Sequence, residues 1–248
     1  MNVVVTGGGT IAPIDDVRHI ANASTGRFSA AITEACLARG AQVWHIHTPN
    51  AVLPFSQQAQ LKLQALDTDD ELTRLAEVLK AWKSVQHRLH LEPLDEGTIS
   101  DYTTRLHTIL HNHPIDVAFL AMAASDFEPT VPFTGKLETP TGEILIPCRP
   151  TQKVILHVRD WAPNVYLVGF KLLSRSSRQD LIAAAEAACE ANRADATVAN
   201  DLQTLRQGAH TIYLVRPGHP AEMLAPPLPI ADRLVDRVFT WVKERGEL

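Results

Sequence analysis

The sequence contains one unusually long connection, Thr6-Gly-Gly-Gly-Thr-Ile-Ala-Pro-Ile-Asp-Asp-Val-Arg-His-Ile-Ala-Asn-Ala-Ser-Thr-Gly26, between its first predicted strand and its first predicted helix. Residues 2–5 are an apolar run typical of a buried strand, and the helical pattern begins only near Arg27. Strand-to-helix turns usually take about two to six residues. Longer loops at the carboxyl ends of parallel strands tend to bind ligands. Because this loop is rich in glycine and polar side chains, we expect it to hold an anionic group.

The composition limits the functions that the chain can have. Of its 248 residues, 45% are hydrophobic and 21% are charged, which is ordinary for a globular protein. The formal charge of −5 argues against general binding to nucleic acids or membranes, although a local basic pocket remains possible. The three cysteines lack metal-ligand spacing, and we find neither a signal peptide nor a membrane-spanning run. We therefore expect a cytoplasmic protein.

Strand and helix patterns alternate along the chain. This alternation predicts an α/β fold with a doubly wound, mainly parallel Rossmann-like sheet and helices on both faces. The predicted helices are 28–39, 69–83, 98–112, 151–160, 178–192 and 230–245. The predicted strands are 2–5, 41–47, 85–92, 116–124, 143–148, 165–173, 196–199 and 210–215. We expect a single domain over residues 1–248, with a protruding, proline-rich flap at about 127–147.

The glycines of the long loop are the first candidate site. Glycines after a first strand let backbone N–H groups approach phosphate oxygens without a Cβ in the way. The spacing of Gly7, Gly8 and Gly9 matches neither Gly-x-Gly-x-x-Gly nor the Walker lysine loop. A tight turn without a ligand explains these glycines equally well.

Four polar residues could act beside this loop. An arginine such as Arg18 can bind phosphate through two parallel hydrogen bonds, and the amide of Asn22 can orient an acyl group. Asp126 ends the central predicted strand, where ligands of open sheets bind. Lys136, in the flap, could fold over a nucleotide and neutralise developing charge. The alternatives are a solvated surface charge for Arg18 and for Lys136, a turn residue for Asn22, and helix capping or turn formation for Asp126.

The sequence lacks the residue patterns of several other catalytic sites. His45 and His47 alternate on one predicted strand, and His111 and His113 flank a helix end, but neither pair has a third ligand at useful spacing. We therefore predict no protein-held metal site. No nucleophile elbow and no Tyr-x-x-x-Lys pair are present either.

Separated motifs carry a resemblance to a known family. They are Gly-Gly-Thr10, Pro-Ile-Asp15, Asp-Val-Arg18-His-Ile-Ala-Asn22-Ala-Ser-Thr-Gly26, Ala-Ala-Ser-Asp126-Phe, Gly-Lys136-Leu, Asp-Trp-Ala-Pro163, Val-Gly-Phe170-Lys-Leu-Leu and Ala-Asp195-Ala-Thr-Val-Ala-Asn200-Asp. In this order, over roughly residues 3 to 201, they resemble the signature of phosphopantothenate–cysteine ligases. The length suits the stand-alone form of that enzyme.

The resemblance implies a reaction and its ligands. Such enzymes activate the carboxylate of 4′-phosphopantothenate with CTP or ATP, release pyrophosphate, and pass the acyl-nucleotide intermediate to the amine of cysteine in coenzyme A biosynthesis. Mg²⁺ is shared among the triphosphate oxygens. Relatives are homodimers in which the flap and part of the site reach across the interface. Such activation needs positioned cations and backbone dipoles and no protein nucleophile.

The resemblance also assigns roles to residues. Catalytic roles fall on Arg18, Asn22 and Lys136. Nucleotide contacts are implied for Gly8, Gly9, Thr10, Ala123, Ala124, Asp126, Lys136, Lys153 and Phe170. Contacts with phosphopantothenate are implied for Arg18, Asn22, Ser24, Thr25 and Gly26.

One departure from the family concerns the nucleotide. Helix 178–192 lacks the lysines that many relatives place there for the nucleotide phosphates, and Lys153 and Arg149 are the candidates to replace them. We favour CTP over ATP. Two other functions stay open from the sequence: an NAD(P)-dependent oxidoreductase on a similar sheet, and a nucleotide-sensing module without turnover. Pyrophosphate release would indicate the ligase, and a change in nicotinamide absorbance would indicate the oxidoreductase. Tight nucleotide binding without pyrophosphate release would indicate the sensing module.

Overall fold

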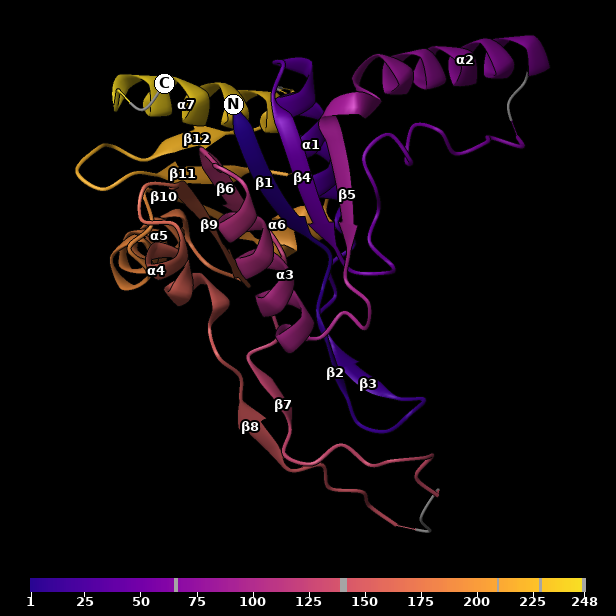
Figure 1. Cartoon of the computed structure of the whole chain (residues 1–248), viewed down its shortest axis with the longest axis vertical. Coiled ribbons are helices and arrows are strands. Elements are labelled where there is room, and N and C mark those ends of the chain that lie inside the picture. Colours follow the sequence, from indigo (N-terminus) through magenta and orange to yellow (C-terminus); the bar gives the residue numbers. More distant parts are fainter. Residues whose placement is uncertain (65–66, 139–141, 209, 228, 247–248) are drawn as a thin grey trace.

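A computed structural model describes residues 1–64, 67–138, 142–208, 210–227 and 229–246. In these residues one large sheet forms the centre of the molecule (Figure 1). Its strands are β1 (Asn2–Gly7), β4 (Gln42–His47), β5 (Leu89–Pro93), β6 (Val117–Leu120), β9 (Tyr166–Leu173), β10 (Ala196–Asp201), β11 (Ile212–Val215) and β12 (Glu222–Leu224). The helices are α1 (Arg27–Ala38), α2 (Thr68–Val85), α3 (Ile99–Asn112), α4 (Val158–Trp161), α5 (Arg178–Asn192), α6 (Leu202–Arg206) and α7 (Ile230–Glu244).

The order of the strands locates the ligand crevice. The sheet runs β12-β11-β10-β9-β6-β1-β4-β5, and the strands from β5 to β10 are parallel. From β1 the chain first proceeds outward through β4 and β5, then returns to β6 on the other side of β1. In such doubly wound sheets, ligands bind outside the carboxyl ends of the strands at the point of reversal. The crevice is therefore expected beyond β1 and β6.

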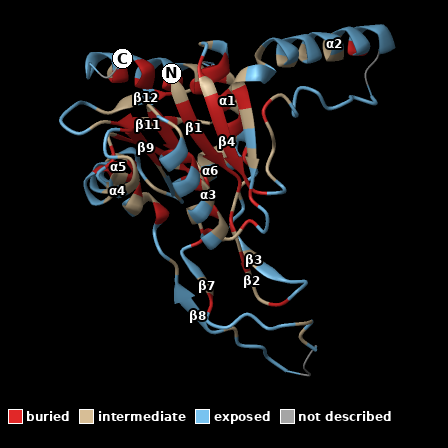
Figure 2. Cartoon of the chain, in the orientation of Figure 1, coloured by how far each residue is buried: buried red, intermediate tan, exposed pale blue. Residues whose placement is uncertain are grey.

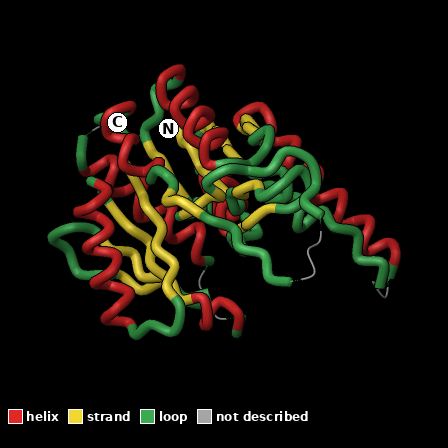
Figure 3. Tube along the Cα trace, turned by 90° about the horizontal axis from the view of Figure 1, so that it is seen from below, coloured by secondary structure: helices red, strands yellow, loops and turns green. Residues whose placement is uncertain are grey.

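Two apolar clusters cover the two faces of the sheet. Val3 and Val5 of β1 face the cluster that includes α1 and α7, whereas Val4 faces the cluster that includes α3 and α4. This alternation follows from the two-residue period of a strand. A smaller cluster joins α5 to β10 and β11. Figure 2 shows the buried residues concentrated in the sheet and Figure 3 shows helices flanking the strands, so the predicted fold class is confirmed.

Two thin arms extend from the carboxyl edge of the sheet (Figure 1). One is a hairpin of β2 (Ile11–Pro13) and β3 (His19–Ala21), which lies inside the long connection. The other is the flap, whose base is the antiparallel pair β7 (Phe127–Pro129) and β8 (Cys148–Pro150). The predicted flap at about 127–147 falls within this second arm, although residues 139–141 lie outside the described ranges.

Several predicted boundaries were wrong. The strand expected at 143–148 pairs only at 148–150, where β7 supplies a partner. The helix expected at 151–160 is replaced by the turn η2 (Val154–His157) and the short α4, because Thr151 is held extended by its N–H bond to Asp126 O (3.0 Å). The strand expected at 85–92 begins at Leu89, after α2 and the turn η1 (Gln86–Arg88). The central strand ends at Leu120, not at residue 124.

His45 is a buried titratable side chain beneath the site. Its Nδ1 lies 2.7 Å from Thr33 Oγ1, and within the described residues no hydrogen-bond partner reaches its Nε2. Burial, together with the nearby His47, lowers the pKa of His45 to about 3. The folded protein therefore keeps this imidazole neutral where an unfolded chain would protonate it.

This shift predicts acid sensitivity. Below pH ~6.5 the unfolded chain binds a proton at His45 that the folded chain does not, so stability falls as the pH drops from there toward 3. The variant His45→Gln lacks this site. Between pH 7 and pH 5 the parent should lose about 2 kcal/mol more unfolding free energy than the variant, measured by urea denaturation. Parallel pH profiles would show that His45 is not responsible.

Candidate functional site

The loops that follow β1 and β6 are joined at the expected crevice. Thr10 N–H donates to Ala123 O (3.1 Å), and Ala123 N–H donates to Gly8 O (2.9 Å). The Thr10 hydroxyl, fully buried, accepts a bond from Ser125 N–H (2.9 Å). Three of the residues predicted to contact the nucleotide, Gly8, Thr10 and Ala123, are thus neighbours. In this structure the Thr10 side chain connects the two loops.

The glycines of the loop are packed against other parts of the chain. Gly8 has φ +92°, and a Cβ there would lie 2.1 Å from Thr48 Oγ1. A Cβ on Gly9 would lie 2.5 Å from Asn22 O. The chain's own packing therefore requires glycine at both positions. That these glycines also admit phosphate oxygens stays a prediction.

The amino terminus of α1 abuts the glycine loop. Gly26 caps the helix with φ +74°, and a Cβ on it would lie 3.3 Å from Gly8 N. Just before it, Ser24 N–H donates to Asn22 O (2.8 Å), and Thr25 O accepts from Val52 N–H (2.9 Å). A helix amino terminus presents free N–H groups and a partial positive charge. The predicted substrate-binding residues 24–26 therefore lie at the amino terminus of α1, which favours anions.

Asn22 connects the long loop to the loop after β6. Its Nδ2 donates to Ala123 O (3.2 Å) and to Ala124 O (3.0 Å). The residue is exposed, and within the described chain no donor contacts its Oδ1. These bonds fix the plane of the amide, so Oδ1 has a set direction in which to accept a hydrogen bond from a ligand.

Asp15 joins the hairpin to the flap. Its buried carboxylate accepts bonds from Val17 N (2.9 Å), Arg18 N (2.7 Å), Arg18 Nη1 (2.6 Å) and Leu137 N (3.0 Å). Burial acts to raise the pKa of Asp15, but the N–H groups of Val17, Leu137 and Arg18 outweigh it and lower the pKa. Sequence reasoning quoted Asp15 within a motif and gave it no role. Aspartate commonly accepts bonds from the backbone N–H groups two and three residues further on, so the sequence does contain a signal for the turn at Asp15.

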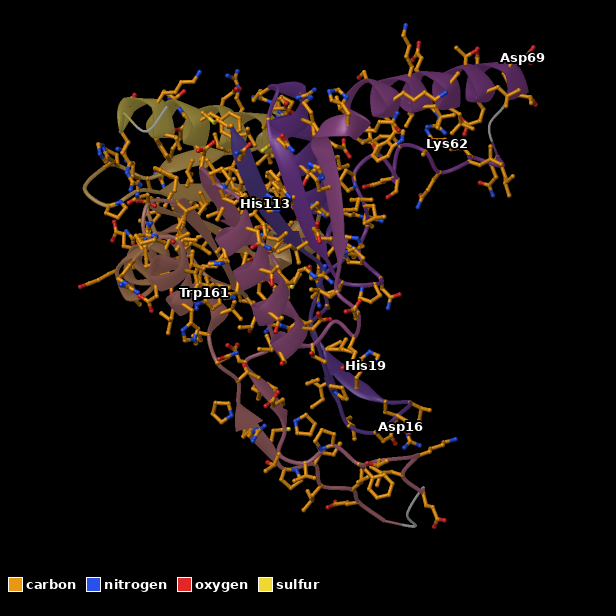
Figure 4. The ribbon with its side chains drawn as sticks, in the orientation of Figure 1. Asp16, His19, Lys62, Asp69, His113 and Trp161 are labelled. Atoms are coloured by element: carbon orange, nitrogen blue, oxygen red, sulfur yellow. The ribbon has the colours of Figure 1, made fainter. Side chains whose placement is uncertain are left out.

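The same arm contacts bring the backbone on either side of Lys136 to the hairpin that carries Arg18. Gly135 exchanges two bonds with Asp16, through Gly135 N to Asp16 Oδ2 and Asp16 N to Gly135 O, both 3.0 Å. Arg18 Nη1 also donates to Leu137 O (3.2 Å). Lys136 is therefore exposed between two fixed residues, at the tip where Figure 4 labels Asp16. Two predicted catalytic cations, Arg18 and Lys136, belong to one unit formed by hairpin and flap.

Asp126 and Lys153 meet at the base of the flap. Lys153 Nζ lies 3.9 Å from Asp126 Oδ1, with side chains 65% and 75% exposed respectively. An ion pair this exposed contributes little to stability. Both side chains are therefore accessible to a ligand.

Phe170 belongs to a separate aromatic group. Its ring lies edge-on to Phe28 (centroids 6.1 Å apart), and Phe28 in turn contacts the ring of His210 (4.4 Å). Burial lowers the pKa of His210, so the imidazole is kept neutral. Sequence reasoning missed Phe28 and His210, since only the fold brings α1, β9 and the start of the β11 segment together.

The described residues contain neither a metal-binding cluster nor a membrane-spanning helix. No group of three or more His, Cys, Asp or Glu side chains in them is arranged to hold a metal ion. Within the same ranges, no helix combines the length and apolar character needed to cross a membrane.

The fold is that of several solved structures. A Cab2 mutant in complex with phosphopantothenate-cysteine superimposes with a TM-score of 0.84 at 22% identity, covering 98% of this chain and 86% of that one. The DNA/pantothenate metabolism flavoprotein from Streptococcus pneumoniae superimposes with a TM-score of 0.74, also at 22% identity, covering 99% of each chain. The molecule is thus a doubly wound α/β protein of this structural group.

The family follows from the sequence match. The model of the DNA/pantothenate metabolism flavoprotein C-terminal domain matches residues 1–90 and 98–240, and the chain belongs to this family. The bifunctional coenzyme A biosynthesis protein CoaBC of Thermococcus kodakarensis is 29% identical over 86% of this chain. The human phosphopantothenate–cysteine ligase is 27% identical over 68% of it. The chain spans 44% of the first relative and 63% of the second.

The Asp15 junction gives a prediction about the flap. The variant Asp15→Asn loses the charge that attracts four donors, so the flap should detach from the hairpin more often. We expect trypsin to cleave after Lys136 about tenfold faster or more, followed by mass spectrometry of the fragments. Asp95→Asn is the control, since Asp95 is 83% exposed and makes one long ion pair with Arg105. Equal cleavage rates in both variants would show that Asp15 does not hold the flap.

Proposed function

We propose that this chain is a ligase that joins 4′-phosphopantothenate to cysteine through an acyl-nucleotide intermediate, in coenzyme A biosynthesis. The observation that carries this proposal is the convergence of Asn22, Ala123 and Ala124 beyond the carboxyl ends of β1 and β6, with Arg18 on the adjoining hairpin and Lys136 on the flap bonded to it. Family membership and the names of the human and Thermococcus relatives support it.

Each side chain is suited by its chemistry to a different part of the proposed reaction. Arg18 on the hairpin and Lys136 on the flap are exposed cations. They are suited to bind the phosphate of the substrate and to stabilise the charge that develops on the nucleotide. Asn22, with its amide plane fixed, is suited to orient the acyl group for attack by the amine of cysteine. No protein nucleophile is required by this route.

The nucleotide is proposed to lie along the glycine loop and the start of α1. Backbone N–H groups at that helix end favour a triphosphate, and Asp126, Lys153 and Phe170 are the proposed contacts beyond it. Mg²⁺ would take its oxygen ligands largely from the triphosphate, because the described residues offer no three-carboxylate or histidine cluster. We favour CTP over ATP as the co-substrate.

The arms support a homodimer with a shared site. The flap extends away from the sheet and is exposed along most of its length (Figure 2), and several of its exposed side chains are large and apolar. These are Val131, Phe133, Ile144 and Leu145. Exposed apolar groups on an extended arm are typical of a surface that a partner covers.

We also propose that the reaction takes place in the cytoplasm. The three cysteines are free thiols, in keeping with that compartment.

One incubation tests the reaction and the nucleotide together. The protein is mixed with phosphopantothenate, Mg²⁺ and each of the four nucleoside triphosphates, with and without cysteine, and the products are weighed by mass spectrometry. We expect pyrophosphate and an acyl nucleotide without cysteine, and phosphopantothenoylcysteine with it. Nucleotide binding without pyrophosphate release would contradict a ligase, and so would a change in nicotinamide absorbance on a hydroxy substrate with no amide formed.

Asn22→Asp tests the role of the amide. A carboxylate at this position cannot donate to the carbonyl oxygens of Ala123 and Ala124, and it would be repelled by them. We expect the acyl nucleotide to form and to accumulate, while its capture by cysteine slows, as followed by quenched-flow product analysis. Amide formation at the parent rate would remove Asn22 from the mechanism.

Lys136→Gln tests the flap cation. Removing one charge-stabilising group from an active site typically lowers turnover by roughly tenfold or more, and we expect a loss of that size in kcat. Lys80→Gln on α2 is the matched control, since it removes an equally exposed lysine far from the arms. If the two variants have the same rate, Lys136 is an ordinary surface residue.

A further inference from the structure

Helix α2 projects from the body at the end of the molecule opposite the two arms (Figures 1 and 3). Its inner side is fixed to its own chain through Glu71. The Glu71 carboxylate binds Arg74 Nε (2.8 Å) and Lys62 N (2.7 Å), and Arg74 Nη2 reaches Gln60 O (2.9 Å). Hydrogen bonds from Arg74 and from Lys62 N–H lower the pKa of Glu71 to about 2. These bonds set which side of the helix faces residues 60–62 of its own chain.

This orientation divides the apolar side chains of α2 between two stripes. The inner stripe is buried or half-buried and consists of Glu71, Leu75, Val78, Trp82 and Val85. The outer stripe is exposed throughout and consists of Asp69, Leu72, Ala76, Leu79 and Lys83. Both have alternating spacings of three and four residues, which keep a row of side chains on one side of a helix.

The outer stripe is close to symmetric about Ala76. Leu72 and Leu79 flank this alanine and are 57% and 55% exposed. Asp69 and Lys83 each lie seven residues from it, with opposite charges. When two copies of this helix are laid antiparallel across their alanines, each aspartate faces the other copy's lysine and each Leu72 faces a Leu79. The small alanine at the centre lets the two backbones approach closely.

The charges of the whole helix agree with that arrangement. Asp69, Asp70 and Glu71 lie in its first turn, and Lys83 lies in its last turn. An antiparallel pair places the acidic end of each helix against the basic end of the other and opposes the two helix dipoles. A parallel pair would set like charges together.

We propose that the outer stripe of α2 binds the same stripe of a second copy of this chain, as an antiparallel helix pair about a two-fold axis. Such an interface is self-complementary, so one stripe supplies both sides. The acidic residues argue against a membrane as the occupant, because helices that lie on anionic lipid carry a basic polar face. This interface lies apart from the arms, and it does not depend on the proposed reaction.

The association should be weak. A single pair of helices buries less than the ~1,200 Å² that separates transient from standard interfaces, so we expect the paired species to grow with protein concentration. Sedimentation velocity of the full chain over a wide range of concentration would measure it. The variant Leu72→Ser/Leu79→Ser should lose this growth in mass with concentration, whereas any assembly formed by the flap remains in both proteins.

Charge reversal makes the test specific. In Asp69→Lys, or in Lys83→Asp, both ion pairs become like-charge contacts by symmetry, and we expect association to weaken about tenfold or more. The double variant Asp69→Lys/Lys83→Asp should regain parent association. An equal mixture of the two single variants should also regain it, because every contact in the mixed pair joins a lysine to an aspartate.

The controls separate pairing from folding. Glu77→Lys makes the same change of charge on the same helix outside the outer stripe, and it should associate like the parent. Circular dichroism and the Tm should be unchanged in every variant. The proposal is wrong if parent and Leu72→Ser/Leu79→Ser have the same mass at all concentrations, or if neither the double variant nor the mixture regains association.

Discussion

The backbone pairing of Ala123 with Gly8 and Thr10 is the contact on which the candidate site depends. At the reversal point of a doubly wound sheet, the chain leaves β1 and β6 toward opposite faces, so the loops beyond these strands diverge. Here the pairing carries the sheet's hydrogen bonding past the ends of both strands. Asn22 then has two carbonyl groups at a fixed distance to which it can donate. The glycines belong to this arrangement, because a Cβ on Gly8 would collide with Thr48 in the loop after β4, and a Cβ on Gly9 would collide with the backbone oxygen of Asn22.

A second constraint sits in the arms, which have little core of their own. A carboxylate in such a thin structure is normally left in water, yet the Asp15 side chain is fully covered. The cost of removing it from water is offset by charge-assisted bonds from backbone and guanidinium donors. Since one donor comes from the flap, hairpin and flap form a single unit. Arg18 and Lys136 thereby keep their relative position without an apolar core beneath them.

The sequence predicted the sheet well because its strands are buried on both faces and separated by amphipathic helices, which are strong periodic signals. It also predicted Asn22 in the long loop, Asp126 after the central strand, and Lys136 in the flap. It could not predict the role of Asp15, because that role depends on a contact with the distant Leu137, which no local sequence pattern indicates. For the same reason β7 was missed and the strand at β8 was predicted too early, because each has three residues and is paired only with the other.

The candidate site is assembled from residues that are very distant along the chain. Asn22 and Ala123 are 101 positions apart, and Asp15 and Leu137 are 122 apart. Closing such long loops is entropically costly, so these contacts form only once the centre of the sheet has been built. A small molecule bound there would consequently favour the fully folded chain over every partly folded one. Its presence should slow amide exchange across β1, β4 and β6 together, rather than at the surrounding loops alone.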